Sequence, residues 1–458
     1  MLNEKLDDYL KENYYPFHMP GAKRTDILRS DLPYKRDLTE IYGFDNLNDP
    51  RDIFLKMEEK IAKIYKVKDA IISTNGSTCG ILSTIRSLTY ENKNILIQRS
   101  CHKSVYNAIE IFNLQSDYVN VSVDDNGSII DISYKDLENK LKSKKYAAFV
   151  ITSPSYEGYY LDLKKIYQLT KKYETSLILD MAHGSHSLLF GKYENYFDIA
   201  ITSFHKNLSA LTPSSAVLIN NLSFSDEIHR NMAIFQTSSP SYVILQSIDE
   251  MLEGFDSFYK MYEMLDLYLD DIYNINLEKL KLIDKKNKDR SKILISTINT
   301  NISGEMLANK LREEKIEIEM AYPSYALLIA SIFDRKEGFE KLKNALVKID
   351  KSIEYGNKNM DFSYEIPKKS IAISRAILAR KTLIDLNLAE NKISAQFVYA
   401  YPPGIPIIAP GEIISKNIID NIKYFQKNSI VLNIDDEIFI LNWQIIIKLI
   451  ILNCIAII

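Results

Sequence analysis

Short apolar runs alternate with amphipathic stretches from about residue 51 onward. Apolar side chains recur at helical spacing between residues 53 and 64, and the run 70–73 has the length of a buried strand. After the turn 74–77 we expect a second helix, which begins at Thr78. Further apolar runs with the character of buried strands are 95–97, 146–152, 177–179, 199–201 and 215–219, the last a return strand.

Strands that are separated by helices predict crossover connections and a mostly parallel sheet covered by helices. A long helix rich in Tyr, Met and Leu is expected near residues 255–280, and a second α/β set follows it from about residue 290. We therefore predict an α/β fold with a large domain and a smaller C-terminal α/β domain. The expected parts are an N-terminal arm with the loops that lead inward (1–50), a large cofactor-binding domain (51–280), a small C-terminal domain (281–441) and an apolar tail (442–458).

The tail is strongly apolar, but Asn442, Gln444, Lys448 and Asn453 interrupt it. A membrane-spanning helix needs roughly 18 or more apolar residues with few or no charges. We interpret the tail as a buried or poorly ordered terminal segment rather than a membrane anchor, so no membrane association is expected. The alternative interpretation is a tail that is unrelated to the ancestral domain.

Composition and charge are those of an ordinary globular protein. Of 458 residues, 46% are hydrophobic and 26% charged, and the formal net charge of −3 provides no basic field for nucleic acid. Cys79, Cys101 and Cys454 are widely spaced and form neither a metal-ligand pattern nor a disulfide framework. The polar N-terminus has no signal-peptide core. We therefore expect a cytoplasmic protein without a metal site.

Two side chains near predicted strand ends have the chemistry that pyridoxal 5'-phosphate (PLP) requires. Lys206 ends the motif Ser203-Phe204-His205-Lys206 after one strand, and Asp180 ends an earlier strand. A lysine for a Schiff base and a carboxylate for the pyridinium nitrogen are the groups that bind this cofactor. Taken singly, Asp180 is explained equally by a helix-capping aspartate, and Lys206 by an exposed lysine, which is what most lysines are.

The neighbours of this pair have matching properties. Asp180 would keep the ring nitrogen protonated by charge pairing. Ala182 is small enough to leave room for a ring face, and His183 could reach the ring substituents. Ser203 and His205 could bind a phosphate group and position the lysine. The sequence therefore predicts a PLP site off the carboxyl ends of these strands.

Two further motifs lie near predicted strand ends. In Asn75-Gly76-Ser77-Thr78, Gly76 allows close approach of an anion to the backbone, and Ser77 and Thr78 add hydroxyl donors at a helix N-terminus. A simple helix cap is the alternative interpretation. His102 has a flat imidazole that could stack on a cofactor ring, or it is an ordinary loop or core histidine.

These motifs together resemble the Orn/Lys/Arg decarboxylase family, the fold-type-I PLP-dependent amino-acid decarboxylases. The similarity runs through most of the chain and is specific because of the order of the motifs. The motifs are Met19-Pro20-Gly21-Ala22-Lys23-Arg24, Asp37-Leu38-Thr39-Glu40, Ser73-Thr74-Asn75-Gly76-Ser77-Thr78, Cys101-His102-Lys103-Ser104, Thr152-Ser153-Pro154-Ser155-Tyr156-Glu157-Gly158, Asp180-Met181-Ala182-His183-Gly184-Ser185-His186, Ser203-Phe204-His205-Lys206, Gln236-Thr237-Ser238-Ser239-Pro240-Ser241-Tyr242, Tyr401-Pro402-Pro403-Gly404-Ile405-Pro406 and Pro410-Gly411-Glu412.

The resemblance implies roles for individual residues. It implies a homodimer or higher homo-oligomer, because one segment reaches the cofactor of the neighbouring subunit in this family. It also implies a short form without the receiver-like wing domain. The implied roles are PLP attachment for Lys206, pairing with the ring nitrogen for Asp180, ring stacking for His102, phosphate binding for Gly76, Ser77, Ser203 and His205, and contact with the neighbouring cofactor for Thr237 and Ser238.

The implied reaction is decarboxylation of arginine, lysine or ornithine to an amine and CO2, a step of polyamine biosynthesis. Glu157 or another acidic group could meet the distal cation of the substrate. The chain departs from the family pattern at Ala22, where histidine is usual, and at Met181, where an acidic residue is usual. Because fold does not fix the reaction, transamination and retro-aldol cleavage are alternatives. The two departures and the unusual tail also favour a non-catalytic PLP-binding paralogue as a further alternative.

Overall fold

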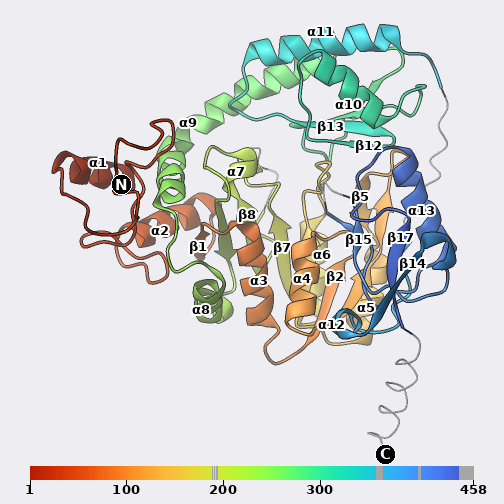
Figure 1. Ribbon diagram of the computed structural model, residues 1–458, viewed down its shortest axis with the longest axis horizontal. Helices are drawn as coiled ribbons and strands as arrows, with labels where there is room; N and C mark the ends of the chain where they lie inside the picture. The colour runs from red at the N-terminus through yellow and green to blue at the C-terminus, as the bar shows by residue number, and fades with distance from the viewer. Residues whose placement is uncertain (188, 190, 192–193, 357–364, 401–403, 443–458) are drawn as a thin grey trace, which may run out of the picture. The chain divides into compact units, whose positions relative to one another are not determined.

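The computed structural model describes residues 1–187, 189, 191, 194–356, 365–400 and 404–442 (Figure 1). The chain divides into two compact units, each built from separate stretches of sequence. Unit 1 contains residues 1–91, 162–267 and 331–334, and unit 2 contains residues 92–161, 268–330 and the chain from residue 335 onward. The domain boundaries expected from the sequence stay predictions.

The largest sheet has seven strands in the order β1-β9-β8-β7-β6-β2-β3. The pairs β7–β8, β2–β6 and β2–β3 are parallel, whereas β9 is antiparallel to both of its neighbours, β1 and β8. The mostly parallel α/β architecture is therefore confirmed, and β9 is the expected return strand. The strands are β1 (Asp69–Ser73), β2 (Asn94–Gln98), β3 (Gln115–Val119), β6 (Ala148–Thr152), β7 (Ser176–Met181), β8 (Ile199–Ser203) and β9 (Ser215–Ile219).

The helices of unit 1 follow the apolar pattern of the sequence, with two differences at their starts. The helix expected between residues 53 and 64 is α2, whose apolar face is buried at Ile53, Met57 and Ile61. Helix α3 begins at Gly76, before the predicted start, and α9 begins well before residue 255. The helices are α1 (Leu2–Lys11), α2 (Ile53–Tyr65), α3 (Gly76–Leu88), α6 (Leu163–Lys172), α7 (Phe204–Asn207), the short η1 (Leu222–Phe224), α8 (Ser225–Phe235) and α9 (Tyr242–Tyr273), which continues into unit 2.

Unit 2 has a second sheet of four antiparallel strands, in the order β10-β11-β13-β12. Helices α10 and α11 lie together over one side of it (Figure 1). The strands are β10 (Lys281–Leu282), β11 (Lys292–Ser296), β12 (Met320–Tyr322) and β13 (Tyr325–Ile329), and the helices α10 (Gly304–Glu313) and α11 (Lys336–Ser352). Elsewhere in the unit are α4 (Lys103–Ile111), β4 (Val121–Val123), β5 (Ile129–Ile132) and α5 (Tyr134–Ser143).

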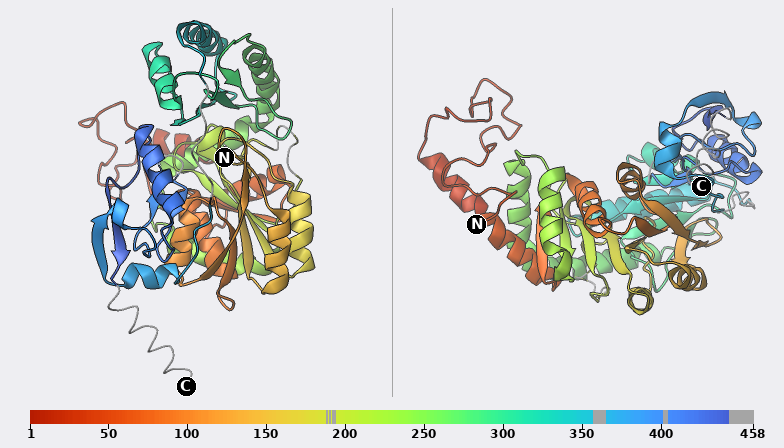
Figure 2. Two further views of the ribbon diagram at one scale, coloured as in Figure 1. Left: turned by 90° about the vertical axis from the view of Figure 1, so that its right-hand side faces the viewer. Right: turned by 90° about the horizontal axis from the view of Figure 1, so that it is seen from below.

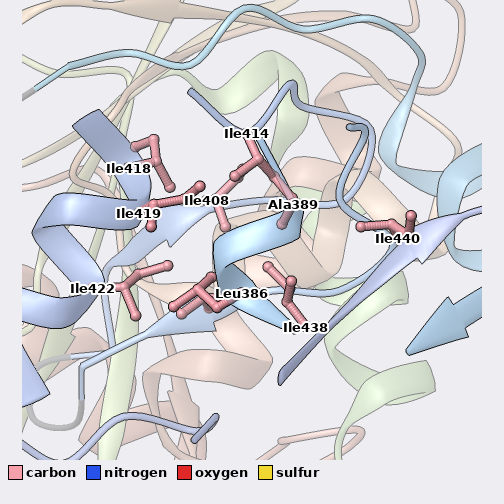
Figure 3. Packing of buried hydrophobic residues seen from close by; sticks show 10 residues of the cluster. Leu386, Ala389, Ile408, Ile414, Ile418, Ile419, Ile422, Ile438 and Ile440 are labelled. Atoms are coloured by element: carbon pink, nitrogen blue, oxygen red, sulfur yellow. The ribbon is translucent and has the colours of Figure 1, made fainter. Parts of the chain in front are cut away.

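The C-terminal part of unit 2 has its own apolar core. Isoleucines from a helix, strands and turns meet there, among them Ile408, Ile414, Ile422 and Ile438, each at most 1% exposed (Figure 3). The elements are α12 (Ile373–Leu378), β14 (Lys381–Asp385), η2 (Leu386–Leu388), β15 (Val398–Tyr399), β16 (Pro406–Ile408), α13 (Lys416–Lys427) and β17 (Glu437–Leu441). The predicted apolar tail lies outside the described residues after Asn442.

Turns and loops make up the segment between α1 and α2, residues 12–52. From here on, the arm means residues 12–52 rather than the whole predicted range 1–50. Figure 2 shows the arm in red; Arg36 hydrogen-bonds to Gln246 of α9, and Asp45 accepts from the N–H of Phe54 in α2 and from the Tyr242 hydroxyl of α9. Within the ranges that the structure describes, no helix is both long enough and apolar enough to cross a membrane.

Helix α3 sits unusually close to the sheet of unit 1 because residue 80 has no side chain. A Cβ atom at Gly80 would lie 2.9 Å from Cγ2 of Val217 in β9 and 3.2 Å from Cγ2 of Ile201 in β8. Both neighbours are fully buried, branched side chains with little room to move. This contact sets the distance between the N-terminus of α3 and the strand ends beside it.

We expect Gly80→Ala to destabilise the protein by about 1–3 kcal/mol, because the added methyl group overpacks the contact with Val217 and Ile201. Gly338→Ala is the matched control. Gly338 also lies in a helix, α11, but a Cβ there meets nothing within 4 Å. Helix propensity alone then stabilises the variant by up to about 1 kcal/mol. Calorimetric melting temperatures that move in the same direction for both variants would contradict this interpretation.

Candidate active site

The register of four strands gathers the predicted site residues of unit 1 at one edge of the sheet. Ser215 of β9 pairs with Ser73 at the end of β1 and with Ser203 at the end of β8. In β7, Met181 pairs with Thr202. The carboxyl ends of β1, β7 and β8 therefore lie level, and the segments that follow them start from the same edge.

Lys206 lies on the four-residue helix α7, which follows β8 directly, rather than on the strand itself. Phe204 anchors this helix, because its side chain is fully buried and its N–H donates to the carbonyl of Ser214 at 3.1 Å. The Lys206 side chain is partly exposed, and its Nζ lies 3.0 Å from Nε2 of His183. The amine is thus held next to an imidazole beyond the end of the neighbouring strand.

Asp180 is the penultimate residue of β7 and is only 3% exposed. One carboxylate oxygen accepts from the N–H of Ala182 at 3.1 Å. Burial raises the pKa of the Asp180 carboxyl, while the charge of Lys206 and the Ala182 N–H act against that rise. A buried carboxylate in this position gains from any cation that comes to lie next to it.

Ser203, His205 and Ser214 surround the start of α7. His205 Nδ1 lies 2.9 Å from the carbonyl of Ser214, so Nδ1 is the protonated nitrogen and donates. Burial lowers the pKa of His205, which favours the neutral ring. Ser203 Oγ and Ser214 Oγ are buried and have no hydrogen-bond partner among the described residues. Buried hydroxyls without partners are uncommon in proteins, and a bound anion would satisfy them.

Gly76 begins α3 with φ +73°, a backbone conformation that residues with side chains rarely adopt. A Cβ there would meet Cβ of Pro213 at 3.4 Å. Ser77 is partly exposed and Thr78 exposed on the first turn. The N-terminal N–H groups of this helix therefore open on the strand-end edge, which is a favourable place for an anion.

Thr237 and Ser238 lie beside the same turn and are exposed. The N–H of Thr237 donates to the side-chain oxygen of Asn75 at 3.3 Å, and Gln236 accepts from the N–H of Thr74 at 3.1 Å. The segment predicted to reach a neighbouring subunit is thus fastened to the predicted phosphate turn of its own chain.

His102 belongs to unit 2 and is the N-cap residue of α4. Its Nδ1 accepts from the N–H of Ser104 at 3.3 Å and lies 2.9 Å from Ser104 Oγ. A neutral ring therefore carries its proton on Nε2. The side chain is partly exposed, so the turn fixes the ring without enclosing it.

Glu157 accepts two hydrogen bonds inside unit 2. Its two oxygens lie 2.9 Å from Ser155 Oγ and 3.0 Å from the Tyr325 hydroxyl, both of which donate. Burial raises the pKa of the Glu157 carboxyl. These two donors hold the Glu157 carboxyl in place within unit 2, and its contact with a distal substrate cation stays a prediction.

The residues gathered in unit 1 fit PLP in chemistry. An amine, a buried carboxyl group, hydroxyls without partners and a helix N-terminus match the aldehyde, ring nitrogen and phosphate of the cofactor. No sequence motif singled out Ser214. It stands directly before the predicted return strand 215–219, and its place beside Ser203 follows only from the register of that strand.

Two family models match the chain. The model of the Orn/Lys/Arg decarboxylase major domain matches residues 2–276, and that of the Orn/Lys/Arg decarboxylase C-terminal domain matches residues 363–432. The arginine decarboxylase of Bacillus anthracis is 26% identical over 457 residues, which cover 92% of each chain.

Solved structures support the same fold. The constitutive lysine decarboxylase of E. coli superimposes with a TM-score of 0.80 at 17% identity, over 96% of this chain and 82% of its own. A serine palmitoyltransferase of S. paucimobilis solved with bound PLP gives a TM-score of 0.52 at 14% identity, over 65% of this chain and 76% of its own. The predicted PLP-dependent transferase fold type I is confirmed. The chain belongs to the Orn/Lys/Arg decarboxylase family.

Proposed function

We propose that this protein is a PLP-dependent decarboxylase that converts arginine, lysine or ornithine to the corresponding amine and CO2. The observation that carries the proposal is the arrangement of Lys206 and Asp180 at one sheet edge in a chain of this family. Bound PLP supplies an electron sink for the bond that breaks at the α-carbon. The side chains of the protein attach the cofactor, transfer protons and bind the phosphate.

Lys206 supplies the amine that attaches the cofactor, and after release the same amine is available to move a proton at the α-carbon. His183, 3.0 Å away through Nε2, is the group that can share a proton with it. Asp180 stays ionised against a protonated ring nitrogen and so keeps that proton in place. Ala182 and His102 are assigned to the ring faces, His102 on the family pattern alone.

The phosphate site is assigned to the edge formed by α3 and α7. Ser203 Oγ and the N-terminus of α3 supply donors there. His205 already donates from Nδ1 to a carbonyl, so only Nε2 can face a phosphate. In the neutral ring Nε2 carries no proton, and a phosphate bound beside it would favour the protonated ring that can donate. The full set assigned to the phosphate is Gly76, Ser77, Thr78, Ser203 and His205.

The names of the relatives point to two different basic amino acids. The curated relative is named an arginine decarboxylase, while the solved neighbour is a lysine decarboxylase. Ala22 and Met181, the two departures from the family pattern, keep the non-catalytic paralogue as a second candidate. We also propose a reducing cytoplasmic location, because Cys79, Cys101 and Cys454 are widely spaced in the sequence and form no disulfide framework.

Lys206→Ala is expected to abolish the visible absorption of added PLP bound as a Schiff base. We expect it to reduce decarboxylation by on the order of a thousandfold or more, as loss of a covalent catalyst does. Lys164→Ala, an exposed lysine of α6, is the control and should keep both properties. Absorption spectra and amine detection on arginine, lysine and ornithine measure the effect.

The products separate the alternatives. CO2 with agmatine, cadaverine or putrescine supports the proposal and names the substrate. An oxo acid indicates transamination, and an aldehyde with a shortened amino acid indicates retro-aldol cleavage. Bound PLP without turnover of any of the three amino acids indicates the non-catalytic paralogue.

Asp180→Asn is expected to change cofactor affinity and the stability of the cofactor-free protein in opposite directions. Since burial raises the pKa of this carboxyl, the cofactor-free protein loses stability as the pH rises from the unfolded pKa through the folded one. The amide removes that cost, so the melting temperature at pH 7 should rise by a few degrees. PLP affinity should fall roughly 10- to 100-fold with the lost charged contact.

Asp198→Asn is the matched control for this experiment. Asp198 is also buried in unit 1, but it accepts from Lys171 and from the N–H of Leu177 at 2.5 and 2.8 Å. Its replacement should lower the melting temperature and leave PLP affinity nearly unchanged. Melting curves with and without PLP distinguish the two variants, and a destabilised cofactor-free Asp180→Asn protein would contradict the assigned role.

We also propose that a second copy of the chain covers the arm. Phe17 and Ile27 are 91% and 93% exposed, and Tyr15 and Tyr42 are also largely exposed. Apolar side chains gathered in this way mark protein interfaces. We expect sedimentation equilibrium to give at least twice the 52.8 kDa chain mass. The double variant Phe17→Ser/Ile27→Ser should shift it towards the monomer, whereas Tyr90→Ser, an exposed control two residues after α3, should not.

A further inference from the structure

We propose that the buried ion pair of Arg99 and Glu412 positions His102, which makes both members positioning residues for the reaction. The inference rests on the proposed function, because it concerns the residue assigned to ring stacking. All the residues involved belong to unit 2. The pair joins two sequence motifs that the cofactor chemistry leaves unconnected, the turn before His102 and the Pro410-Gly411-Glu412 segment.

The ion pair is enclosed by protein. Arg99 Nη2 lies 3.1 Å from Glu412 Oε2, and the two side chains are 2% and 0% exposed. The guanidinium lies over the rings of Tyr106 and Tyr118, at 5.5 and 5.1 Å from their centres. A guanidinium does not lose its proton in a protein, so its burial requires a carboxylate nearby.

Arg99 is part of a closed loop of contacts around His102. Its Nη1 donates to the Tyr106 hydroxyl at 2.5 Å, and that hydroxyl donates back to the Arg99 carbonyl at 2.6 Å. The N–H of Arg99 is held by the carbonyl of Val119 at 3.2 Å. The chain between Arg99 and Tyr106 therefore has both ends fixed by one side chain, and His102 lies in the middle of it.

Glu412 is presented by a turn that can hardly move. Its Oε2 also accepts from the N–H of Ala409 at 2.7 Å. Gly411 has φ +87°, and a Cβ there would lie 2.4 Å from the carbonyl oxygen of Ile371. Ile408 and Ile414, on either side of the turn, are buried in the C-terminal core (Figure 3). The carboxylate is thus a fixed reference point against which Arg99 is set.

Stability alone is a weak reason for such a pair. Removing two charges from water costs about as much as their attraction returns, and well-packed apolar residues of similar volume often serve as well. What apolar residues cannot supply is direction, since the planar guanidinium binds Glu412, Tyr106 and the carbonyl of Ile407 in one orientation. The geometry therefore indicates that the pair orients the turn that carries His102.

The test separates orientation from stability with the double variant Arg99→Met/Glu412→Leu. We expect its melting temperature to return to within a few degrees of the parent protein, whereas Glu412→Gln alone melts much lower because it leaves a buried charge. With PLP bound, kcat should still fall about 100-fold with little change in KM, as misplacement of a positioned group predicts. The visible circular dichroism of bound PLP should weaken in parallel.

A second readout needs no cofactor. In histidine-labelled protein, the 15N shifts of His102, assigned with His102→Gln, should show the proton on Nε2 in the parent and mixed tautomers in the double variant. Asp350→Asn is the control, because this buried acid of unit 2 holds the N–H groups of residues 278–280 at 2.8–3.0 Å. It should lower the melting temperature without changing kcat, KM or the His102 tautomer.

The positioning role is overturned if the double variant has the same kcat and the same His102 15N chemical shifts as the parent protein. If it does not fold, Tyr106→Phe takes its place, since it removes the contacts that close the loop and keeps the ion pair. We then expect a roughly tenfold fall in kcat with mixed tautomers, and parent values would overturn the inference. A parent protein that turns over no basic amino acid refutes the proposed function, while the tautomer measurement still decides the role of the pair.

Discussion

The antiparallel strand β9 is the element on which the candidate site depends. It lies between β1 and β8, and Ser215 pairs with the last residue of each. Through this pairing β1 and β8 run in the same direction and end at the same level. The N-terminus of α3 and the helix that carries Lys206 are thereby brought to one edge, although they come from distant parts of the sequence.

Close packing then turns this register into a site. Gly80 lets α3 approach β8 and β9, and Phe204 fixes α7 at the end of β8. The same edge has a buried carboxyl at Asp180 and hydroxyls such as Ser203 Oγ that lack partners among the described residues. These buried polar groups lower the stability of the cofactor-free protein. A charged, phosphorylated ring would supply the partners that they lack.

The sequence predicted those parts that depend on local pattern. The strand runs, α2 and the return strand β9 follow from hydrophobic spacing, and Lys206 and Asp180 follow from reactive side chains beside those runs. Element starts were less accurate, because Gly76 enters α3 with a positive φ that propensity does not anticipate. Glu157 could not be judged from sequence, since its partner Tyr325 lies far along the chain.

The sequence also could not predict side-chain contacts between residues that lie far apart in the chain. Nothing near Arg99 in the sequence points to Glu412, and only the folded C-terminal core brings the two together. The single sequence could signal each motif, but not the contact that joins them. The Ser214 hydroxyl likewise becomes visible as a site group only once the register of β9 is known.

The pairing of β9 with β1 also bears on how the chain is made. β1 leaves the ribosome long before β9 exists, and at roughly 5–20 residues per second the wait lasts on the order of ten seconds. During that time Ile71 and Ile72 belong to a strand without its partner, and such edges are prone to wrong association. The pairing that unites the site thus leaves β1 without its partner until nearly half of the chain has been synthesised.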